Sequence, residues 1–293
     1  MRPILQRDDI AVLTVGSLHY DIMVEADHLP RRDETAVGTR WFPKFGGKGG
    51  NQAVAVARAG ITSRMVGAVG RDDFGTFLRD ALRAAQVDDT HVATIDGSGS
   101  GMSVAIADAS GDYAATIVSG ANLLIDEGAM DAAPWGDVRM LVLQNEVREE
   151  TNLAAARAAH GRGVPVILNA APARPLPVEL SGLVDILVVN GVEAEMYGSD
   201  SVTDLDSAAA AASLLVAGYP IVIVTAGGAG LAFATRDGQR GTVPARKVSV
   251  ISTHGAGDCF TGSLAAALAA GHDLATACTM ASDASARHVS TAG

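Results

Sequence analysis

The sequence predicts an α/β fold: a doubly wound, mainly parallel sheet with helices on both faces, plus a small β lid. Along most of the 293-residue chain, short apolar runs alternate with helical stretches rich in small residues. Hydrophobic residues make up 48% of the chain and aromatic residues only 4%, which favours helices packed closely on a buried sheet. Two segments, roughly 18–42 and 98–120, instead contain alternating apolar and polar stretches, so we expect them to form the lid.

The expected strands of the main sheet are short apolar runs bounded by turn residues. The first, at 10–15, ends at Gly16 and Ser17. Further strands are expected at 140–144, 164–169, 186–190, 221–225 and 231–234. The run at 246–250 is also able to form a strand. Helical patterns fill the spaces between them, the clearest at 54–60, 206–217, 262–270 and 274–290. In the lid, runs at 102–107 and 113–118 flank the turn residues 108–112, which is typical of a hairpin.

Length and charge limit the possible functions. The length allows one large domain or two ordinary ones, and we expect a single α/β domain over residues 1–293. The chain has 22 Lys and Arg against 33 Asp and Glu, a net charge of −11 without a basic stripe. Nucleic acid and anionic membranes are therefore poor candidates as partners.

The cysteines and the hydropathy pattern bear on where the protein acts. Cys259 and Cys278 fit a reducing compartment and no disulfide framework. The N-terminus has no long apolar h-region, and no apolar run approaches the length of a membrane span. We therefore expect a cytoplasmic protein that is not anchored in a membrane.

The segment Ser252 to Asp258 is the most informative motif. A turn through Gly255, Ala256 and Gly257 opens a helix, which leaves backbone N–H groups unpaired at the positive end of the helix dipole. Such a turn binds anions, and phosphate especially. The Asp258 carboxylate would repel phosphate there unless it takes a proton from an attacking hydroxyl. The alternative is that Asp258 only caps the helix, since Asp favours first turns.

A second glycine cluster, Gly-Gly-Lys-Gly-Gly-Asn-Gln, spans residues 46–52 and leads into the helix expected at 54–60. It is not a Walker A loop, because Lys48 is followed by glycine rather than Ser or Thr. Glycines such as Gly47 let a small ligand approach the backbone, and Lys48 and Asn51 offer donors for its hydroxyl groups. The alternative is a tight strand-to-helix turn with Lys48 in solvent.

Together these motifs resemble the signatures of the ribokinase branch of the PfkB carbohydrate kinases. Three further segments, 67–75, 169–174 and 190–195, resemble that family in the same order, so the likeness covers nearly the whole chain. Several ordered motifs are far more specific than any one of them. The resemblance implies phosphoryl transfer from ATP to a sugar and a lid that closes over the sugar. Such lids often form a dimer interface, so we expect a homodimer.

The resemblance also implies which residues hold the sugar. Asp258 is the expected base, and the ribose-contacting positions of the family match Asp21, Gly47, Lys48, Asn51 and Glu146. The alternatives without a functional role are a solvated loop acid for Glu146 and an ordinary turn residue for Asp21.

One sugar position departs from the family. Where ribokinases usually carry Asn, in Gly-Ser-x-Asn-x-Asp, this chain has His19, which is bulkier and titrates near neutrality. We expect D-ribose as the substrate. Nucleosides, ketohexoses and sugar acids stay open, as does a non-catalytic sugar-binding protein on the same fold.

For the nucleotide, the resemblance implies that Asn190 and Glu193 organise Mg²⁺ through waters. The alternative is a helix capping box, which has similar spacing. A Thr-x-Gly-x-x-Gly-like loop follows the strand at 221–225, and Ser282 is expected near the adenine. The expected nucleotide contacts are therefore Asn190, Thr225, Gly227, Gly228, Gly230, Gly257 and Ser282.

The family often binds a monovalent cation beside the anion-binding turn. Many ribokinases carry Asp where this chain has Ser252, and serine lacks the charge that favours K⁺. Ser252 and the backbone near His254 remain as ligands, so we expect a weaker K⁺ dependence than in a ribokinase with Asp. The His254 side chain, at the variable position, is expected to pack locally or face solvent.

Overall fold

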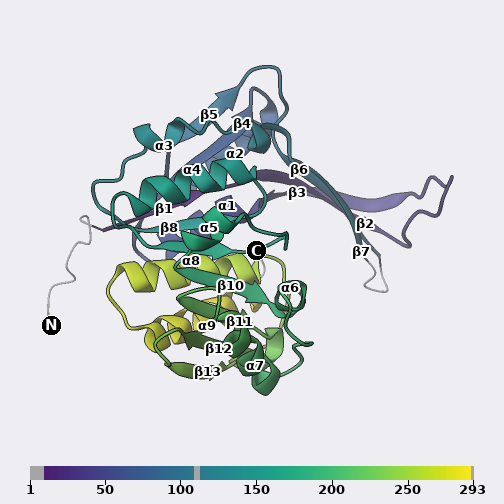
Figure 1. The fold of residues 1–293 in the computed structure, drawn as a ribbon. Helices are drawn as coiled ribbons and strands as arrows, with labels where there is room; N and C mark the ends of the chain where they lie inside the picture. The colour runs from purple at the N-terminus through teal and green to yellow at the C-terminus, as the bar shows by residue number, and fades with distance from the viewer. Residues whose placement is uncertain (1–9, 109–112, 292–293) are drawn as a thin grey trace, which may run out of the picture.

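The computed structural model describes residues 10–108 and 113–291, and in that part the predicted fold class is confirmed (Figure 1). A nine-stranded sheet is flanked by helices, and a separate four-stranded sheet projects from one side. In spatial order the main sheet contains β13 (Arg240–Pro244), β12 (Gly230–Thr235), β11 (Ile221–Thr225), β10 (Ile186–Asn190), β9 (Val166–Asn169), β8 (Val138–Gln144), β1 (Ala11–Val15), β4 (Thr62–Gly70) and β5 (Val87–Ile95). From β11 to β5 all neighbouring strands pair in parallel, and β12 and β13 add an antiparallel edge.

The helices divide between the two faces of this sheet. They are α1 (Lys48–Arg58), α2 (Asp73–Ala84), α3 (Ala129–Ala132), α4 (Glu149–His160), α5 (Val178–Gly182), α6 (Gly191–Met196), α7 (Leu205–Leu215), α8 (Ala256–Ala269) and α9 (Leu274–Val289), with 3₁₀ turns η1 (Gly120–Leu124) and η2 (Gly227–Ala229). Helices α4 to α7 share one core and α1, α8 and α9 the other. Successive strand residues point to opposite faces, so in β10 Leu187 packs into the first core and Val188 into the second.

The four-stranded sheet is the predicted lid. We call it the lid sheet; it orders β3 (Gly38–Gly46), β2 (His19–Ala26), β6 (Met102–Asp108) and β7 (Tyr113–Val118). Strands β6 and β7 pair antiparallel, which confirms the hairpin, although most of its expected turn lies outside the described residues. Strand β3 continues to Gly46, beyond the expected lid boundary at 42, and so carries the lid directly into α1.

The prediction of a strand at 246–250 is wrong. Residues 245–250 run irregularly after β13, and most of their side chains are exposed. Because β13 already ends the sheet, this segment has no neighbouring strand for its backbone groups. It leads instead to Ile251, whose N–H bonds the carbonyl of Val289 in α9.

Helix α1 begins at Lys48, earlier than expected, because part of the glycine cluster lies inside its first turn. A Cβ at Gly49 would lie 2.6 Å from the backbone nitrogen of Ser17, and one at Gly50 would lie 2.7 Å from Leu18 Cδ2. The glycines therefore let the start of α1 pack directly on the segment that follows β1. None of the helices in 10–108 and 113–291 is both long and apolar enough to span a bilayer.

Candidate active site

The main sheet brings polar residues together at the carboxyl ends of its strands. Strands β4 and β5 lie on one side of β1 and β8 to β11 on the other, and crevices at such a reversal bind ligands. Ser17 follows β1, and Glu146 follows β8. Asn169, Asn190 and Thr225 end β9, β10 and β11. The expected convergence of strand ends is present.

A cavity of about 180 Å³ lies at this edge, between the sheet and the start of α8. Its polar lining consists of Lys48, Asn169, Asn190, Glu193, Thr225, Thr253 and the turn from Gly255 to Asp258. Both glycine motifs thus contribute to one cavity. The alternative interpretation of the glycine cluster placed Lys48 in solvent, but its side chain lines this cavity instead.

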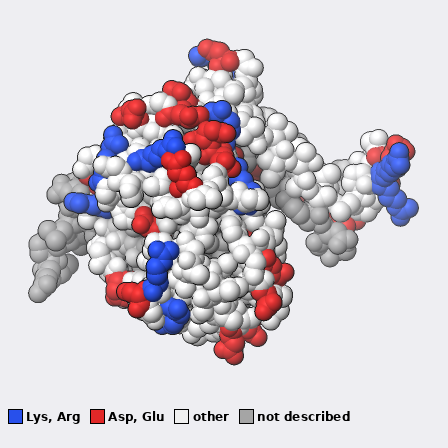
Figure 2. Space-filling model, in the orientation of Figure 1, with Lys and Arg blue, Asp and Glu red and all other residues white. Residues whose placement is uncertain are grey.

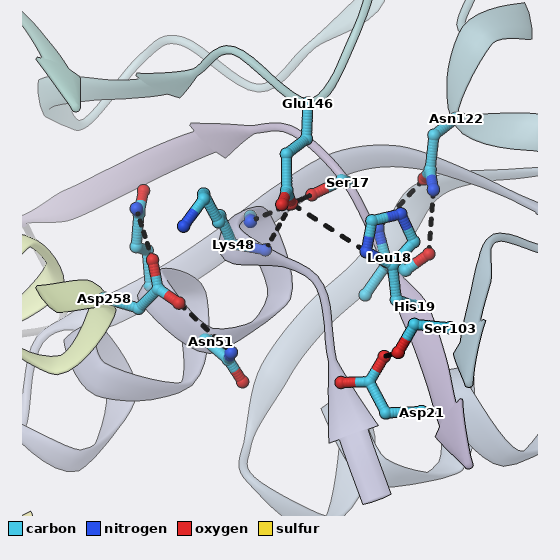
Figure 3. Close-up of polar contacts among 12 residues, drawn as sticks. Ser17, Leu18, His19, Asp21, Lys48, Asn51, Ser103, Asn122, Glu146 and Asp258 are labelled. Carbon is cyan, nitrogen blue, oxygen red and sulfur yellow. Dashed lines mark hydrogen bonds and ion pairs between the residues drawn. The ribbon is translucent and has the colours of Figure 1, made fainter. Parts of the chain in front are cut away.

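Asp258 lies in the first turn of α8 but does not cap it. The residue at the cap is Gly255, which has φ 74° and makes no side-chain cap hydrogen bond. The Asp258 carboxylate is directed at α1 instead (Figure 3), where Asn51 Nδ2 donates to Oδ2 at 3.2 Å and Gln52 Nε2 to Oδ1 at 3.0 Å. The capping interpretation is therefore excluded. The Ala256 N–H donates to the carbonyl of Thr253 at 3.2 Å, while the N–H groups of Gly255 and Gly257 have no acceptor among the described residues and stay available for an anion.

Burial raises the pKa of Asp258, whereas the Lys48 ammonium and the amides of Gln52 and Asn51 oppose this rise. The carboxylate is thus a stronger base than an exposed aspartate. Burial also disfavours the charge on Lys48, but Asp258, Glu146 and Glu193 outweigh it and raise the pKa of Lys48. Lys48 therefore stays cationic among three carboxylates.

Glu146 is not a solvated loop acid. Its Oε2 accepts from the Ser17 hydroxyl at 2.5 Å and from the backbone N–H of Lys48 at 2.9 Å (Figure 3). Nδ1 of His19 lies 3.9 Å from the same oxygen, and His19 Nε2 is buried without a hydrogen-bond partner among the described residues. A buried, unpaired imidazole nitrogen beside a carboxylate is suited to a ligand hydroxyl.

Asp21 lies on β2 rather than in a turn, with its side chain facing the site. Its Oδ1 accepts from Ser103 Oγ of β6 at 2.5 Å, and Lys44 is its cross-strand neighbour on β3. Burial raises the pKa of Asp21, although the hydrogen bond from Ser103 counteracts it. Burial lowers the pKa of Lys44, and the negative charge of Asp21 partly opposes this decrease.

His254 is partly exposed and also packs locally, as expected. Its side chain is 41% exposed, but Nε2 lies 3.9 Å from Oδ2 of Asp21, so the ring faces the lid sheet. Burial and the charge of Lys44 lower the pKa of His254. The anion-binding turn and the lid sheet thus meet at this histidine.

The pair expected to organise Mg²⁺ also forms a capping box. Asn190 Oδ1 accepts from the N–H of Glu193, and Glu193 Oε2 accepts from the N–H of Asn190. The capping alternative is therefore present, but it uses one oxygen of each residue. Glu193 is buried, which raises its pKa, and its carboxyl group lines the cavity.

The loop after β11 leads into β12, another strand, as the sequence indicates. Gly230 has φ 124°, and a Cβ there would lie 2.1 Å from the carbonyl of Val243, so this glycine is needed for strand packing. A Cβ at Gly227 or Gly228 would meet nothing within 4 Å. The three glycines and Ser282 do not line the cavity, whereas Thr225 does.

Several positioning residues gave no separate signal in the sequence. Gln52 Nε2 donates to both Asp258 and Asn169. Ser17 and Ser103 donate to the carboxylates of Glu146 and Asp21. Asn122 bonds both the N–H and the carbonyl of Leu18, which fixes the chain between β1 and β2. Gln52 lies in the glycine cluster at 46–52, and Ser17 lies in the Gly-Ser segment that follows the first strand. These positions were the only sequence signal for the two residues.

The surface does not add a broad positive field. On the face seen in Figure 2, acidic and basic side chains are interspersed, without a basic stripe. Attraction for an anion must come from local groups, namely the N–H groups of the turn and Lys48.

Comparison with known proteins agrees with this geometry. The chain is 34% identical over 260 residues to a ribokinase of Haemophilus influenzae, covering 87% of this chain and 85% of the relative. It is also 34% identical over 261 residues to a deoxyribokinase of Salmonella typhi, covering 88% and 84%. A solved structure of Arabidopsis thaliana ribokinase complexed with ribose and ATP superposes with a TM-score of 0.89 at 27% identity, covering 97% of this chain and 94% of the other.

The family model described as "pfkB family carbohydrate kinase" matches residues 9–293. The match includes both glycine motifs, the lid sheet and the cavity with Asp258. The chain belongs to the pfkB family of carbohydrate kinases, phosphotransferases that act on sugar alcohol groups.

Proposed function

We propose that this protein is a ribokinase, which transfers a phosphoryl group from ATP to D-ribose and forms ribose 5-phosphate. The observation that carries the proposal is the Asp258 carboxylate, held by Asn51 and Gln52 at the mouth of an uncapped helix N-terminus. A base next to an anion site is the arrangement that phosphoryl transfer to a hydroxyl requires.

In the proposed mechanism, Asp258 takes the proton of the primary hydroxyl as its oxygen attacks the γ-phosphorus in line. The N–H groups of Gly255 and Gly257 stabilise the charge that develops on the transferred phosphoryl group, and the Ala256 N–H, bonded to the carbonyl of Thr253, closes the turn between them. Lys48 lies between the two halves of the site and supplies a positive charge close to Asp258 and Glu146. His19, Asp21, Gly47, Asn51 and Glu146 are the proposed sugar contacts, and Thr225, Gly227, Gly228, Gly230 and Ser282 the proposed nucleotide contacts.

The residues present fit a hydrated Mg²⁺. The capping box leaves one Glu193 carboxylate oxygen free at the cavity, and Mg²⁺ commonly uses one or two carboxylates together with waters and phosphates. Bound there, Mg²⁺ would neutralise charge on the nucleotide phosphates. We propose Asn190 and Glu193 as the residues that hold its waters.

A sugar acid is the second candidate substrate, because the cationic side chain of Lys44 lies beside Asp21. The ammonium group of Lys44 has no hydrogen bond or ion pair among the described residues and faces Asp21, and His254 approaches from the opposite element. A neutral pentose needs no such charge, whereas a carboxylate would be attracted by it.

The substrate test is kcat/KM for ATP-dependent turnover with ribose, 2-deoxyribose, fructose, a ketogluconate-type acid and a nucleoside. The proposal predicts the highest value for ribose. A higher value for the acid, lowered by Lys44→Met while ribose use is unchanged, would support the second candidate. The highest value for a nucleoside would contradict both.

Glu146→Ala and Asp21→Ala are expected to impair sugar use much more than ATP use. Each substitution leaves buried donors unpaired: Ser17 and the Lys48 N–H in the first case, Ser103 in the second. The expected loss in kcat/KM for the sugar is roughly 10- to 100-fold, with the KM for ATP nearly unchanged. If ATP binding fell sharply while the KM for ribose stayed the same, these residues would belong to a different subsite.

The pH dependence should reflect the environment of Asp258. The base must be ionised, so kcat/KM is expected to fall as the pH drops through its folded-state pKa, which burial raises above the ordinary value of 3.8. Gln52→Met removes a donor to the carboxylate and should move this acid limb to higher pH. Circular dichroism over the same range controls for acid unfolding; an unchanged limb in the variant would contradict the role of Gln52.

We also propose a homodimer formed through the lid sheet and a cytoplasmic location. Trp41, Ile117 and Val118 are large apolar side chains exposed on lid strands, and such residues are enriched at interfaces. Light scattering is expected to give twice the monomer mass, and Ile117→Arg should reduce it. The free thiols of Cys259 and Cys278 are compatible with a reducing compartment.

A further inference from the structure

The end of helix α9 is tied to the anion-binding turn by hydrogen bonds from several residues. The carbonyl of Val289 accepts from the N–H groups of Ile251 at 2.7 Å and Ser252 at 3.3 Å. The Ser285 hydroxyl donates to the carbonyl of Ala256 at 3.0 Å. These contacts fix both sides of the turn that precedes Asp258.

A histidine side chain reaches the centre of the turn. His288 Nε2 lies 2.9 Å from the carbonyl oxygen of His254. Because a carbonyl only accepts, Nε2 must carry the proton and donate it. The ring is also close to the next residue, since a Cβ built on Gly255 would lie 3.3 Å from this nitrogen. His288 thus holds the peptide unit that enters the left-handed conformation of Gly255, φ 74°.

The atoms that the family resemblance offers to a monovalent cation are already engaged. Ser252 Oγ accepts from the N–H of His254 at 3.3 Å, and the His254 carbonyl accepts from His288. Ser252 offers a neutral hydroxyl rather than a carboxylate. A K⁺ ion here would have to share both oxygens with these N–H donors and would meet no negative charge on Ser252, so the residues present are a poor fit for a K⁺ site.

We propose that the His288 N–H group, rather than a monovalent cation, fixes the His254 carbonyl and so orients the anion-binding turn. The inference rests on the proposed phosphoryl-transfer role of this turn. A donor covalently fixed in α9 keeps the N–H groups of Gly255 and Gly257 directed at the phosphoryl group at any K⁺ concentration. His288 is a positioning residue, because its hydrogen bond is to the backbone of the turn.

Two substitutions separate the hydrogen bond from the packing of the ring. His288→Leu fills similar space without a donor, whereas the amide of His288→Gln can place an N–H near the position of Nε2. We expect His288→Leu to lower kcat roughly tenfold, less than the loss of a direct oxyanion donor, with the KM for the sugar nearly unchanged. His288→Gln should retain most of the wild-type kcat, and Thr279→Ala on the same helix is the matched control.

The cation experiment uses the wild-type protein at fixed ionic strength, with K⁺ exchanged for tetramethylammonium. We expect kcat to change by less than about twofold. The midpoint of thermal unfolding should also be the same in both salts, because an ion that binds only the folded state would raise it. This second measurement needs no turnover, so it remains decisive if the sugar panel fails and the proposed function is wrong.

Saturable activation by K⁺, or a saturable K⁺-specific rise in the unfolding midpoint, would overturn the proposal. It would equally be overturned if His288→Leu kept the wild-type kcat, or if the Gln and Leu variants lost activity to the same extent. The proposal is supported if turnover does not depend on K⁺, if kcat falls in His288→Leu, and if His288→Gln retains most of it.

Discussion

Replacing Asp258 with Asn is expected to lower kcat about 10²–10⁴-fold, the usual contribution of general-base catalysis. Asn has nearly the same shape and keeps one oxygen for the donors of Asn51 and Gln52, but it cannot accept the proton of the attacking hydroxyl. Steady-state turnover and sugar binding, measured separately, distinguish loss of chemistry from loss of binding.

Asp206→Asn provides the matched control for this substitution. Asp206 is an exposed residue near the start of α7 and does not line the cavity, so its replacement should leave kcat unchanged. If Asp258→Asn kept more than about a tenth of the wild-type kcat, Asp258 would not be the base.

Gly262→Ala is expected to destabilise the fold by forcing apart two helices that hold the site. A Cβ there would lie 2.3 Å from the carbonyl of Gln52 and 2.7 Å from Ala55 Cβ, so α8 would have to move away from α1. Overpacking of this kind reduces the free energy of unfolding by about 1–3 kcal/mol. Because Gln52 also positions Asp258, kcat should fall as well.

Denaturant unfolding measures this effect, with Gly182→Ala as the control. Gly182 ends α5, and a Cβ there meets nothing within 4 Å, so that variant should be as stable as the wild type or slightly more stable. Equal stability of the two variants would contradict the close approach of α1 and α8.

Much of the fold follows from local patterns. The strands at 186–190 and 221–225 lie where the apolar runs predict them, because both are buried on two faces and bounded by polar residues. The run at 246–250, Arg-Lys-Val-Ser-Val, contains only two apolar residues and lies beyond the edge of the sheet. Local pattern cannot reveal whether a partner strand is available, and this accounts for the error.

The site was predictable where one motif contains the interacting groups. Asp258 and its turn are contiguous, so their chemistry can be read directly. The contacts of Lys44 and His254 with Asp21 depend on the register between β2 and β3 and on the placement of the lid sheet over α8. A single Lys in an alternating strand gives no such signal. For Asn190 and Glu193, the sequence spacing suits both a helix cap and a metal site. The two residues form the capping box, which uses only one carboxylate oxygen of Glu193.

The most direct test of the central claim is the identity of the phosphorylated product. Wild-type protein is incubated with ATP, Mg²⁺ and either ribose or 5-deoxyribose, which lacks only the primary hydroxyl that Asp258 is proposed to deprotonate. Phosphorus NMR is expected to detect ribose 5-phosphate and ADP in equal amounts from ribose and no sugar phosphate from 5-deoxyribose. Phosphorylation of 5-deoxyribose, or of ribose at another hydroxyl, would contradict the account.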